Sequence, residues 1–150
     1  MRFEELIQKL ESFCAYQERC LGDIQNKLTQ LEANELESKK VIDHLIINRY
    51  FDQSRFAKTF AQGKLRMNKW GKAKIKAALI NKFVENHVIN EALSSIEREE
   101  YSNILKALID RKRTELANEK DEWSKKQKLI RFLSSKGFEY NEIIPLLNYD

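Results

Sequence analysis

Basic side chains are concentrated in one internal stretch of this sequence, between Arg49 and Lys82. No Asp or Glu occurs between Asp52 and Glu85, although acidic and basic residues mix freely elsewhere. The bases of that interval are Arg55, Lys58, Lys64, Arg66, Lys69, Lys72, Lys74, Lys76 and Lys82. Such a local excess of positive charge attracts a polyanion or an acidic protein surface. The stretch therefore predicts a binding face for phosphates or for an acidic groove.

We expect the centre of this stretch to form the main binding face. Its predicted residues are Arg55, Lys64, Arg66, Lys69, Trp70, Lys72, Lys74 and Lys76. Trp70 stands among these cations in a polar turn, where an exposed ring can stack on a base or enter a partner's pocket. Two other interpretations stay open. The whole face can be an ordinary charged helix surface, and Arg55 can be a structural anchor paired with Asp52 or a nearby Glu.

A second group of bases occurs in the last third of the chain. Its members are Arg111, Lys112, Arg113, Lys125, Lys126, Lys128 and Arg131. We expect them to form a secondary basic face that extends the positive lining along the molecule.

The sequence carries no pattern typical of an enzyme. His44 and His87 stand alone on predicted helices, whereas a metal site needs several ligands at fixed spacing. There is no glycine-rich phosphate loop and no nucleophile elbow. Carboxylates are spread along helix faces, as solvated surfaces require. We therefore expect no catalytic activity, no cofactor and no metal.

The composition favours a helical protein of the cytoplasm. The chain has 150 residues, of which 33% are charged, with only four Gly and one Pro and a net charge of +4. The spacing of Cys14 and Cys20 fits neither a redox pair nor a zinc knuckle, so we expect free thiols. No signal peptide opens the chain, and no apolar run approaches the roughly 20 residues of a membrane span.

Apolar residues recur at three- and four-residue steps in nine segments, and none shows the alternation of a strand. The first three expected helices are residues 1–16, 21–31 and 35–48. The fourth is capped by Asp52, the fifth lies around residues 75–79, and the sixth is capped by Asn86. The last three begin at about Glu97, at Trp123 and at about Asn141. We expect residues 63–71 to fray into a turn. Gly137 should end the eighth helix, and Pro145 should lie in the first turn of the ninth.

The helices repeat in groups of three. Residues 79–93 align with residues 133–147, pairing Leu79 with Leu133 and Ile89 with Ile143, and residues 28–45 form a looser copy with a slightly longer turn. Repeated helical units stack their apolar faces on their neighbours. We predict an all-α fold of three tandem three-helix repeats, 1–48, 49–96 and 97–150, in an elongated, curved body. The middle repeat carries the basic stretch.

Several segments resemble one protein family. The segment Y-F-D-Q-S-R-F-A at 50–57 resembles the G-Y-L-D-D-x-R-F-A signature of the RecX regulatory proteins. The basic turn R-M-N-K-W-G-K-A-K-I at 66–75 is similar to that family's R-x-x-K-G-x-G-P-x-x-I segment, and R-F-L-S-S-K-G-F at 131–138 resembles its R-F-L-x-x-R-G-F/Y segment. Residues 19–28 match the family's opening motif loosely. The resemblance covers about residues 6–147.

Three residues depart from the family pattern. Arg49 stands where the family usually has Gly before Tyr50, and Phe83 stands where Gly usually follows Lys82. Ala73 replaces the usual Pro. These changes alter turn chemistry but leave the charge pattern intact.

The resemblance implies regulation of the RecA recombinase. The family binds in the helical groove of the RecA–DNA filament and suppresses ATP hydrolysis, strand exchange and co-protease activity. The implied partners are the RecA filament and, weakly, single- and double-stranded DNA, for a monomer acting in recombinational repair and the SOS response. Two alternatives stay open: a helical nucleic-acid-binding module without a recombinase partner, and an adaptor for another helical protein.

Overall fold

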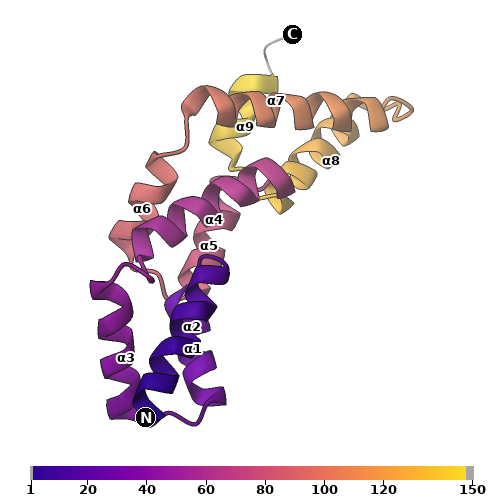
Figure 1. Ribbon diagram of the computed structural model, residues 1–150. Coiled ribbons are helices and arrows are strands. Elements are labelled where there is room, and N and C mark those ends of the chain that lie inside the picture. Colours follow the sequence, from indigo (N-terminus) through magenta and orange to yellow (C-terminus); the bar gives the residue numbers. More distant parts are fainter. Residues whose placement is uncertain (1, 148–150) are drawn as a thin grey trace. The chain divides into compact units, whose positions relative to one another are not determined.

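The computed structural model describes residues 2–147, and all regular structure in that part of the chain is helical. The helices are α1 (Arg2–Tyr16), α2 (Leu21–Gln30), α3 (Glu35–Ile47), α4 (Gln53–Asn68), α5 (Lys72–Asn81), α6 (Asn86–Ser94), α7 (Arg98–Glu115), α8 (Glu122–Ser135) and α9 (Tyr140–Leu147) (Figure 1). The predicted all-α class is confirmed.

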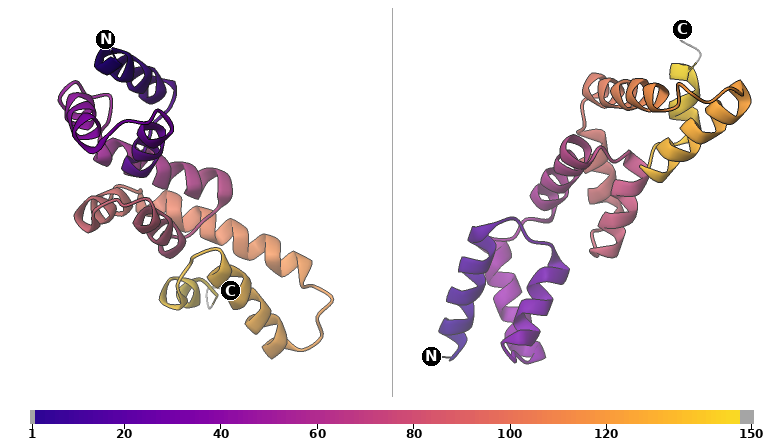
Figure 2. Two further views of the ribbon diagram at one scale, coloured as in Figure 1. Left: turned by 90° about the horizontal axis from the view of Figure 1, so that it is seen from below. Right: turned by 90° about the vertical axis from the view of Figure 1, so that its right-hand side faces the viewer.

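The chain divides into two compact units. Unit 1 comprises residues 1–59 and 79–92, and unit 2 comprises residues 60–78 and 93–150. Helices α1, α2 and α3 pack against one another in unit 1, and α7, α8 and α9 do so in unit 2 (Figures 1 and 2). The units follow contacts in space, whereas the boundaries after residues 48 and 96 follow the sequence repeat. Those boundaries stay a prediction.

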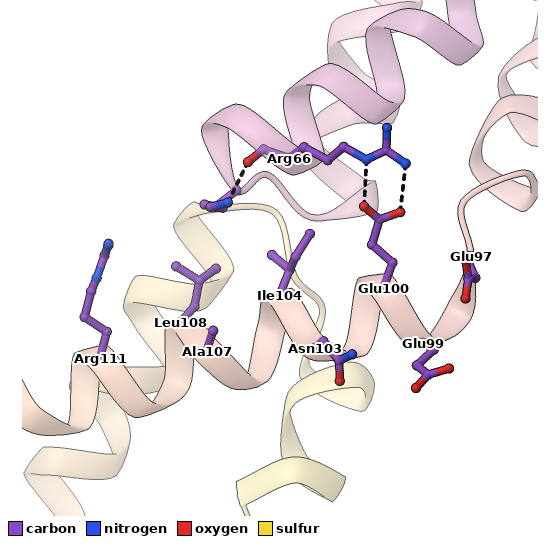
Figure 3. A pocket seen from close by; sticks show the side chains of 10 residues that line it. Arg66, Glu97, Glu99, Glu100, Asn103, Ile104, Ala107, Leu108 and Arg111 are labelled. Atoms are coloured by element: carbon purple, nitrogen blue, oxygen red, sulfur yellow. Dashed lines mark hydrogen bonds and ion pairs between the residues drawn. The ribbon is translucent and has the colours of Figure 1, made fainter.

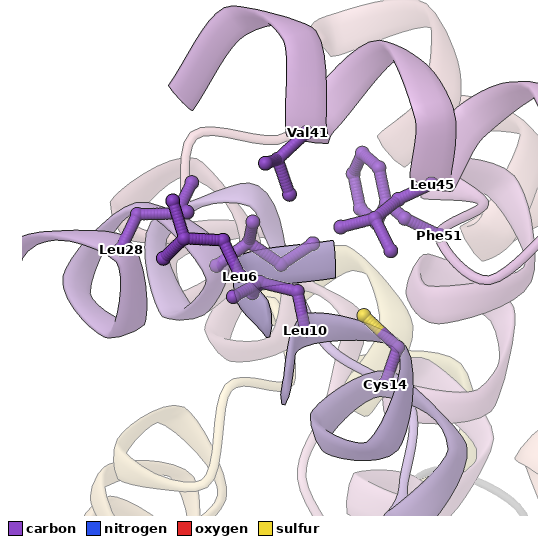
Figure 4. Close-up of a cluster of buried hydrophobic side chains, with 8 residues drawn as sticks. Leu6, Leu10, Cys14, Leu28, Val41, Leu45 and Phe51 are labelled. Carbon is purple, nitrogen blue, oxygen red and sulfur yellow. The ribbon is translucent and has the colours of Figure 1, made fainter. Parts of the chain in front are cut away.

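A small apolar core holds α1, α2 and α3 together. Its buried side chains are Leu6, Leu10, Cys14, Ile24, Leu28, Val41, Leu45 and Phe51 (Figure 4). The helices begin with local capping. The Sγ of Cys20 accepts a hydrogen bond from the amide of Asp23, and Asn34 accepts one from the amide of Glu37. These caps satisfy amides that have no partner within their helices.

The predicted repeat appears as one recurring helix ending. The amide of Ala33 donates to the carbonyl of Leu28, that of Val84 to Leu79 and that of Phe138 to Leu133. In each copy the residue before the donor has a positive φ, at Glu32, Phe83 and Gly137. This is the hydrogen-bond pattern of a Schellman ending, which turns the chain sharply after a helix.

The turn length of the first copy was predicted wrongly. In all three copies the next helix begins seven residues after the buried leucine, at Glu35, Asn86 and Tyr140. The turn near residue 30 is therefore no longer than the other two. Sequence comparison suggested a longer turn because the first fully buried residue of α3, Val41, lies later in its helix than Ile89 and Ile143 lie in theirs.

The predicted turn at residues 63–71 was also wrong, because α4 continues to Asn68. Ala57, Ala61 and Leu65 are fully buried at four-residue spacing. Packing of this stripe offsets the cost of Gly63 inside the helix, which is about 1 kcal/mol. Only the short segment from Lys69 to Gly71 remains as a turn.

Two predictions about helix termini were wrong, and two were confirmed. Asn86 is the first residue of α6 rather than its cap, and Pro145 is the sixth residue of α9 rather than part of its first turn. The cap at Asp52 is confirmed, because its Oδ1 accepts a hydrogen bond from the amide of Arg55. Gly137 ends α8 with φ of +100°.

Candidate partner-binding surface

The short basic turn between α4 and α5 is fixed by backbone contacts within unit 2. The amide of Gly71 donates to the carbonyl of Lys136 at 2.7 Å, and the amide of Ala73 donates to the carbonyl of Gly137 at 3.1 Å. The Nζ of Lys136 donates to the carbonyl of Asn68 at 2.8 Å. The turn therefore holds its neighbouring cations at defined positions.

Glycine is required where the two chain segments meet. A Cβ on Gly71 would lie 2.4 Å from the carbonyl carbon and oxygen of Gly137. Contacts between heavy atoms at that distance are repulsive, and backbone atoms cannot move aside as a flexible side chain can. The close approach explains the glycine in the basic turn.

Trp70 is not the exposed aromatic that the sequence suggested. It is half-buried, and the ammonium groups of Lys64 and Lys74 lie 4.9 Å and 4.7 Å from its ring centroid. Cations at this distance are attracted to an indole ring. Trp70 therefore contacts two of the predicted cations, Lys64 and Lys74, and its ring is not fully exposed for stacking on a base.

Two further lysines of the turn have internal contacts. The Nζ of Lys72 lies 5.0 Å from the centroid of the Tyr101 ring, and the amide of Lys72 donates to the Tyr101 hydroxyl at 3.0 Å. Burial raises the pKa of the Tyr101 hydroxyl far above its usual range. The hydroxyl thus stays protonated as a structural group. The Nζ of Lys69 donates to the carbonyl of Arg66 at 2.6 Å.

The structure adds Lys136 to this cluster, which sequence reasoning missed. Burial, followed by the charges of Lys74 and Arg111, lowers the pKa of Lys136. The Nζ of Lys74 also lies 3.4 Å from the carbonyl of Ser135. Cations from α5, α7 and the end of α8 are therefore neighbours. The alignment of Lys136 with Lys82 was the signal that could have found it.

Both arginines of the predicted face are paired with carboxylates. The guanidinium of Arg66 makes two hydrogen bonds with Glu100, at 2.6 Å and 3.1 Å. Arg55 lies in unit 1, where it pairs with Glu18 and donates to the carbonyl of Arg49. Its pairing supports the anchor interpretation, with Glu18 in place of Asp52. Lys76, the remaining predicted residue, is exposed on α5.

The predicted secondary face is partly neutralised. Lys112, Lys125 and Lys128 have carboxylate partners, which are Glu115, Glu122 and Glu119. The guanidinium of Arg113 donates to the carbonyl of Leu147 at 3.1 Å. The side chains of Arg111, Lys126 and Arg131 are exposed.

The two units differ in net charge. Unit 2 has 17 Lys and Arg against 11 Asp and Glu, which gives +6, and unit 1 has 10 against 12, which gives −2. The positive charge of the molecule therefore belongs to unit 2. A polyanion would be attracted to that unit and weakly repelled by the other.

Within residues 2–147, no cluster of His, Cys, Asp and Glu could hold a metal ion. His44 pairs with Glu11 at 2.7 Å, linking α3 to α1, and His87 lies 3.4 Å from Glu85. Both thiols are free and buried. None of the helices in this part of the chain is long and apolar enough to cross a membrane.

Together, the helical domains and the fixed basic turn define a class of all-α proteins built from three-helix units. Two segments of the chain match family models. Residues 52–93 match the second three-helix domain of RecX, and residues 99–145 match the third three-helix domain of RecX. The chain belongs to the RecX family of regulatory proteins, and the resemblance read from its motifs is confirmed.

Relatives named Regulatory protein RecX support this placement. The protein from Clostridium acetobutylicum is 35% identical over 128 residues, which are 83% of this chain and 59% of the relative. The protein from Clostridium tetani is 31% identical over 111 residues, which are 73% of this chain and 50% of the relative. The chain thus matches only about half of the length of these relatives.

Solved RecX structures share the fold. One crystal structure of regulatory protein RecX has a TM-score of 0.87 at 20% identity, covering 98% of this chain and 73% of that chain. The structure of RecX from Lactobacillus salivarius has a TM-score of 0.89 at 18% identity, covering 97% of this chain and 94% of that chain.

Proposed function

We propose that this protein binds the RecA recombinase–DNA filament and inhibits its ATPase, recombinase and co-protease activities. It would thereby modulate recombinational DNA repair and the SOS response, as a cytoplasmic monomer with no catalytic activity and weak affinity for DNA alone. Membership of the RecX family, whose named relatives are regulatory proteins, is the observation that carries the proposal.

The charge of unit 2 supports a role for the basic turn in this binding. Lys69, Lys72 and Lys74 surround a backbone contact that fixes their positions, in a unit with a net charge of +6. A cation whose position is already fixed loses less conformational entropy when it binds a phosphate or an acidic protein surface. We propose Lys64, Arg66, Lys69, Trp70, Lys72, Lys74, Lys76 and Lys136 as the principal face. The secondary face remains a proposal through its exposed members Arg111, Lys126 and Arg131.

Contact at one filament site would raise the effective concentration of the next contact. We therefore expect one molecule to affect more than one recombinase protomer, and inhibition to appear well below a one-to-one ratio. The first test is DNA-stimulated ATP hydrolysis by the RecA recombinase of the same genome, with increasing amounts of this protein. An ATPase rate that stays constant up to equimolar amounts would contradict the proposal.

A triple charge reversal tests the basic turn. Replacing Lys69, Lys72 and Lys74 by Glu should weaken the inhibition. The matched control reverses Lys9, Lys39 and Lys40, which are exposed bases of unit 1, and makes the same change in net charge. Unchanged inhibition by the first variant would remove the turn from the binding face. Retained single-strand DNA binding without any effect on recombinase would favour a plain nucleic-acid-binding module.

A further inference from the structure

A groove of about 630 Å³ runs along α7 beside the end of α4, entirely within unit 2 (Figure 3). It is lined by one face of α7 between Glu97 and Arg111, and by Arg66 and Lys69 on the opposite side. Its floor is apolar, because Ile104, Ala107 and Leu108 follow one another along one face of α7. These three apolar residues belong to neither predicted basic face, whereas the groove shares Arg66 and Lys69 with the main face and Arg111 with the secondary face.

The two ends of the groove carry opposite charge. Glu97 and Glu99 lie at the start of α7, and Arg111 lies four turns further along the same helix. Lys69, which follows α4, also lines the groove. A helix rises 1.5 Å per residue, so about 21 Å separate the backbone positions of Glu97 and Arg111. The groove thus has an acidic end, an apolar middle and a basic end.

Arg66 and Glu100 neutralise each other beside the apolar floor. Their two hydrogen bonds tie α4 to α7 across the groove (Figure 3). Glu97 and Glu99 are exposed and make no ion pair with any other described residue. The acidic end therefore keeps charge that is available to a ligand.

This arrangement does not suit a nucleic acid. Carboxylates at Glu97 and Glu99 repel phosphates, and an apolar floor offers them no hydrogen bonds. It suits a protein segment, since apolar anchors in the centre of an interface with charged residues at its rim are the usual anatomy of protein recognition.

We propose that the α4–α7 groove binds an amphipathic segment of the recombinase. The segment would place an aliphatic or aromatic anchor over Ile104 and Ala107, a cation near Glu97 and Glu99, and a carboxylate near Arg111. This inference rests on the proposed function and deepens it. Unit 2 then has two adjacent surfaces, the basic turn for phosphates and the groove for protein.

The first test fills the groove. Ala107 is exposed on α7, so Ala107→Trp should occupy the space of the anchor without disturbing buried residues. Ala15→Trp is the matched control, on an exposed position of α1 in unit 1. Circular dichroism checks that both variants fold. Binding to immobilised recombinase without DNA, and to a labelled oligothymidylate, is then measured for each.

We expect Ala107→Trp to weaken recombinase binding by at least about tenfold, the effect of losing one good interface anchor. Its affinity for the oligothymidylate should change by less than about twofold, because the basic turn is intact. Ala15→Trp should leave both unchanged. Equal recombinase binding by the wild type and Ala107→Trp would overturn the inference.

A second variant avoids adding bulk to the helix. Glu97→Gln with Glu99→Gln removes the charge of the acidic end, and both residues are exposed and belong to neither basic face. We expect weaker recombinase binding in this variant also, and unchanged binding would overturn the proposed charge complementarity. If the wild type itself fails to bind or inhibit recombinase, the proposed function is wrong. If the wild type binds and all groove variants match it, only the groove assignment is wrong.

Discussion

Two residues other than glycine, Arg49 and Phe83, adopt left-handed backbone in turns that follow helices. Their φ angles are +61° and +64°, and these are two of the three positions that the motif comparison marked as departures. Left-handed backbone is accessible to glycine without the clash that a Cβ causes. The amide of Ala73 donates to the carbonyl of Gly137, a hydrogen bond that Pro at this position could not make.

The first prediction concerns the left-handed arginine. Arg49→Gly should raise the free energy of unfolding by up to about 1 kcal/mol, because relief of the left-handed conformation exceeds the added entropy of the unfolded chain. Lys39→Gly, in the exposed middle of α3, should lower it by about 1 kcal/mol. Chemical denaturation measures both variants. The same sign for both changes would contradict the conformational argument.

The second prediction concerns the buried thiol of Cys14. Burial raises its pKa to about 11, from an ordinary 9.0, with a smaller raising effect from Glu18. At pH 8 its thiolate is then about 100-fold scarcer than in the unfolded chain, so modification by a disulfide reagent should slow at least in proportion. Cys20→Ser isolates this thiol and keeps an oxygen at the α2 cap.

The same shift has a consequence for stability. The folded protein holds the Cys14 proton more tightly than the unfolded chain does. The stabilisation is fully present below the unfolded pKa near 9 and is lost as pH rises towards 11. Denaturation of the Cys20→Ser variant at several pH values measures this loss.

For the modification experiment, equal rates of reaction of Cys14 with the disulfide reagent in native and denatured protein would show that the thiol is not buried as described.

At the scale of elements, the joined turns after α4 and α8 matter most. Gly71→Ala would force its Cβ against the backbone of Gly137, so we expect a loss of at least about 2 kcal/mol in unfolding free energy. Gly63→Ala is the matched control. Its Cβ meets nothing within 4 Å in the interior of α4, and it should stabilise by about 0.5–1 kcal/mol. Thermal unfolding distinguishes the two, and equal midpoints would contradict the close approach.

Helices were predictable from sequence because their apolar spacing is strong and local. The turn at residues 63–71 was predicted too long because Gly63 and the charges seemed to break the helix, whereas Leu65 packs at zero exposure. The start of α9 was expected within one residue of Tyr140, and Pro145 was misplaced because the fifth residue from Asn141 already lies beyond a first turn of 3.6 residues. In α4, packing of the buried stripe outweighed local preference.

The candidate site was predictable in its charges but not in its pairing. The acid-free interval marked Lys69, Lys72 and Lys74 correctly as neighbours of one turn. Nothing in the spacing showed that Arg66 would pair with Glu100, 34 residues later, or that Lys136 would reach Asn68. The groove along α7 escaped notice for the same reason, because its two sides come from separate parts of the chain.

For the whole molecule, charge separation between the units predicts how DNA binding depends on salt. Neutralising Lys72, Lys74 and Lys76 with Gln should reduce the slope of log K against log salt by about 2, at about 0.7 per lost phosphate contact on single strands. The matched control neutralises Lys9, Lys39 and Lys40 and should leave the slope unchanged. Fluorescence anisotropy with an oligothymidylate between low and moderate salt measures both. Equal slopes in all three proteins would contradict a phosphate-binding face on unit 2.

The interleaving of the two units also determines when each part can finish folding on the ribosome. Unit 1 includes residues 79–92, so its contacts are complete only after the basic turn has already emerged. The basic turn is held by contacts with residues up to 68 positions later in the chain. At 5–20 residues per second, the ribosome needs about 3–14 s to make that length of chain. A nascent or prematurely ended chain therefore exposes its cations without the positions that the finished protein gives them. The basic turn therefore takes its final form only after α8 has been made.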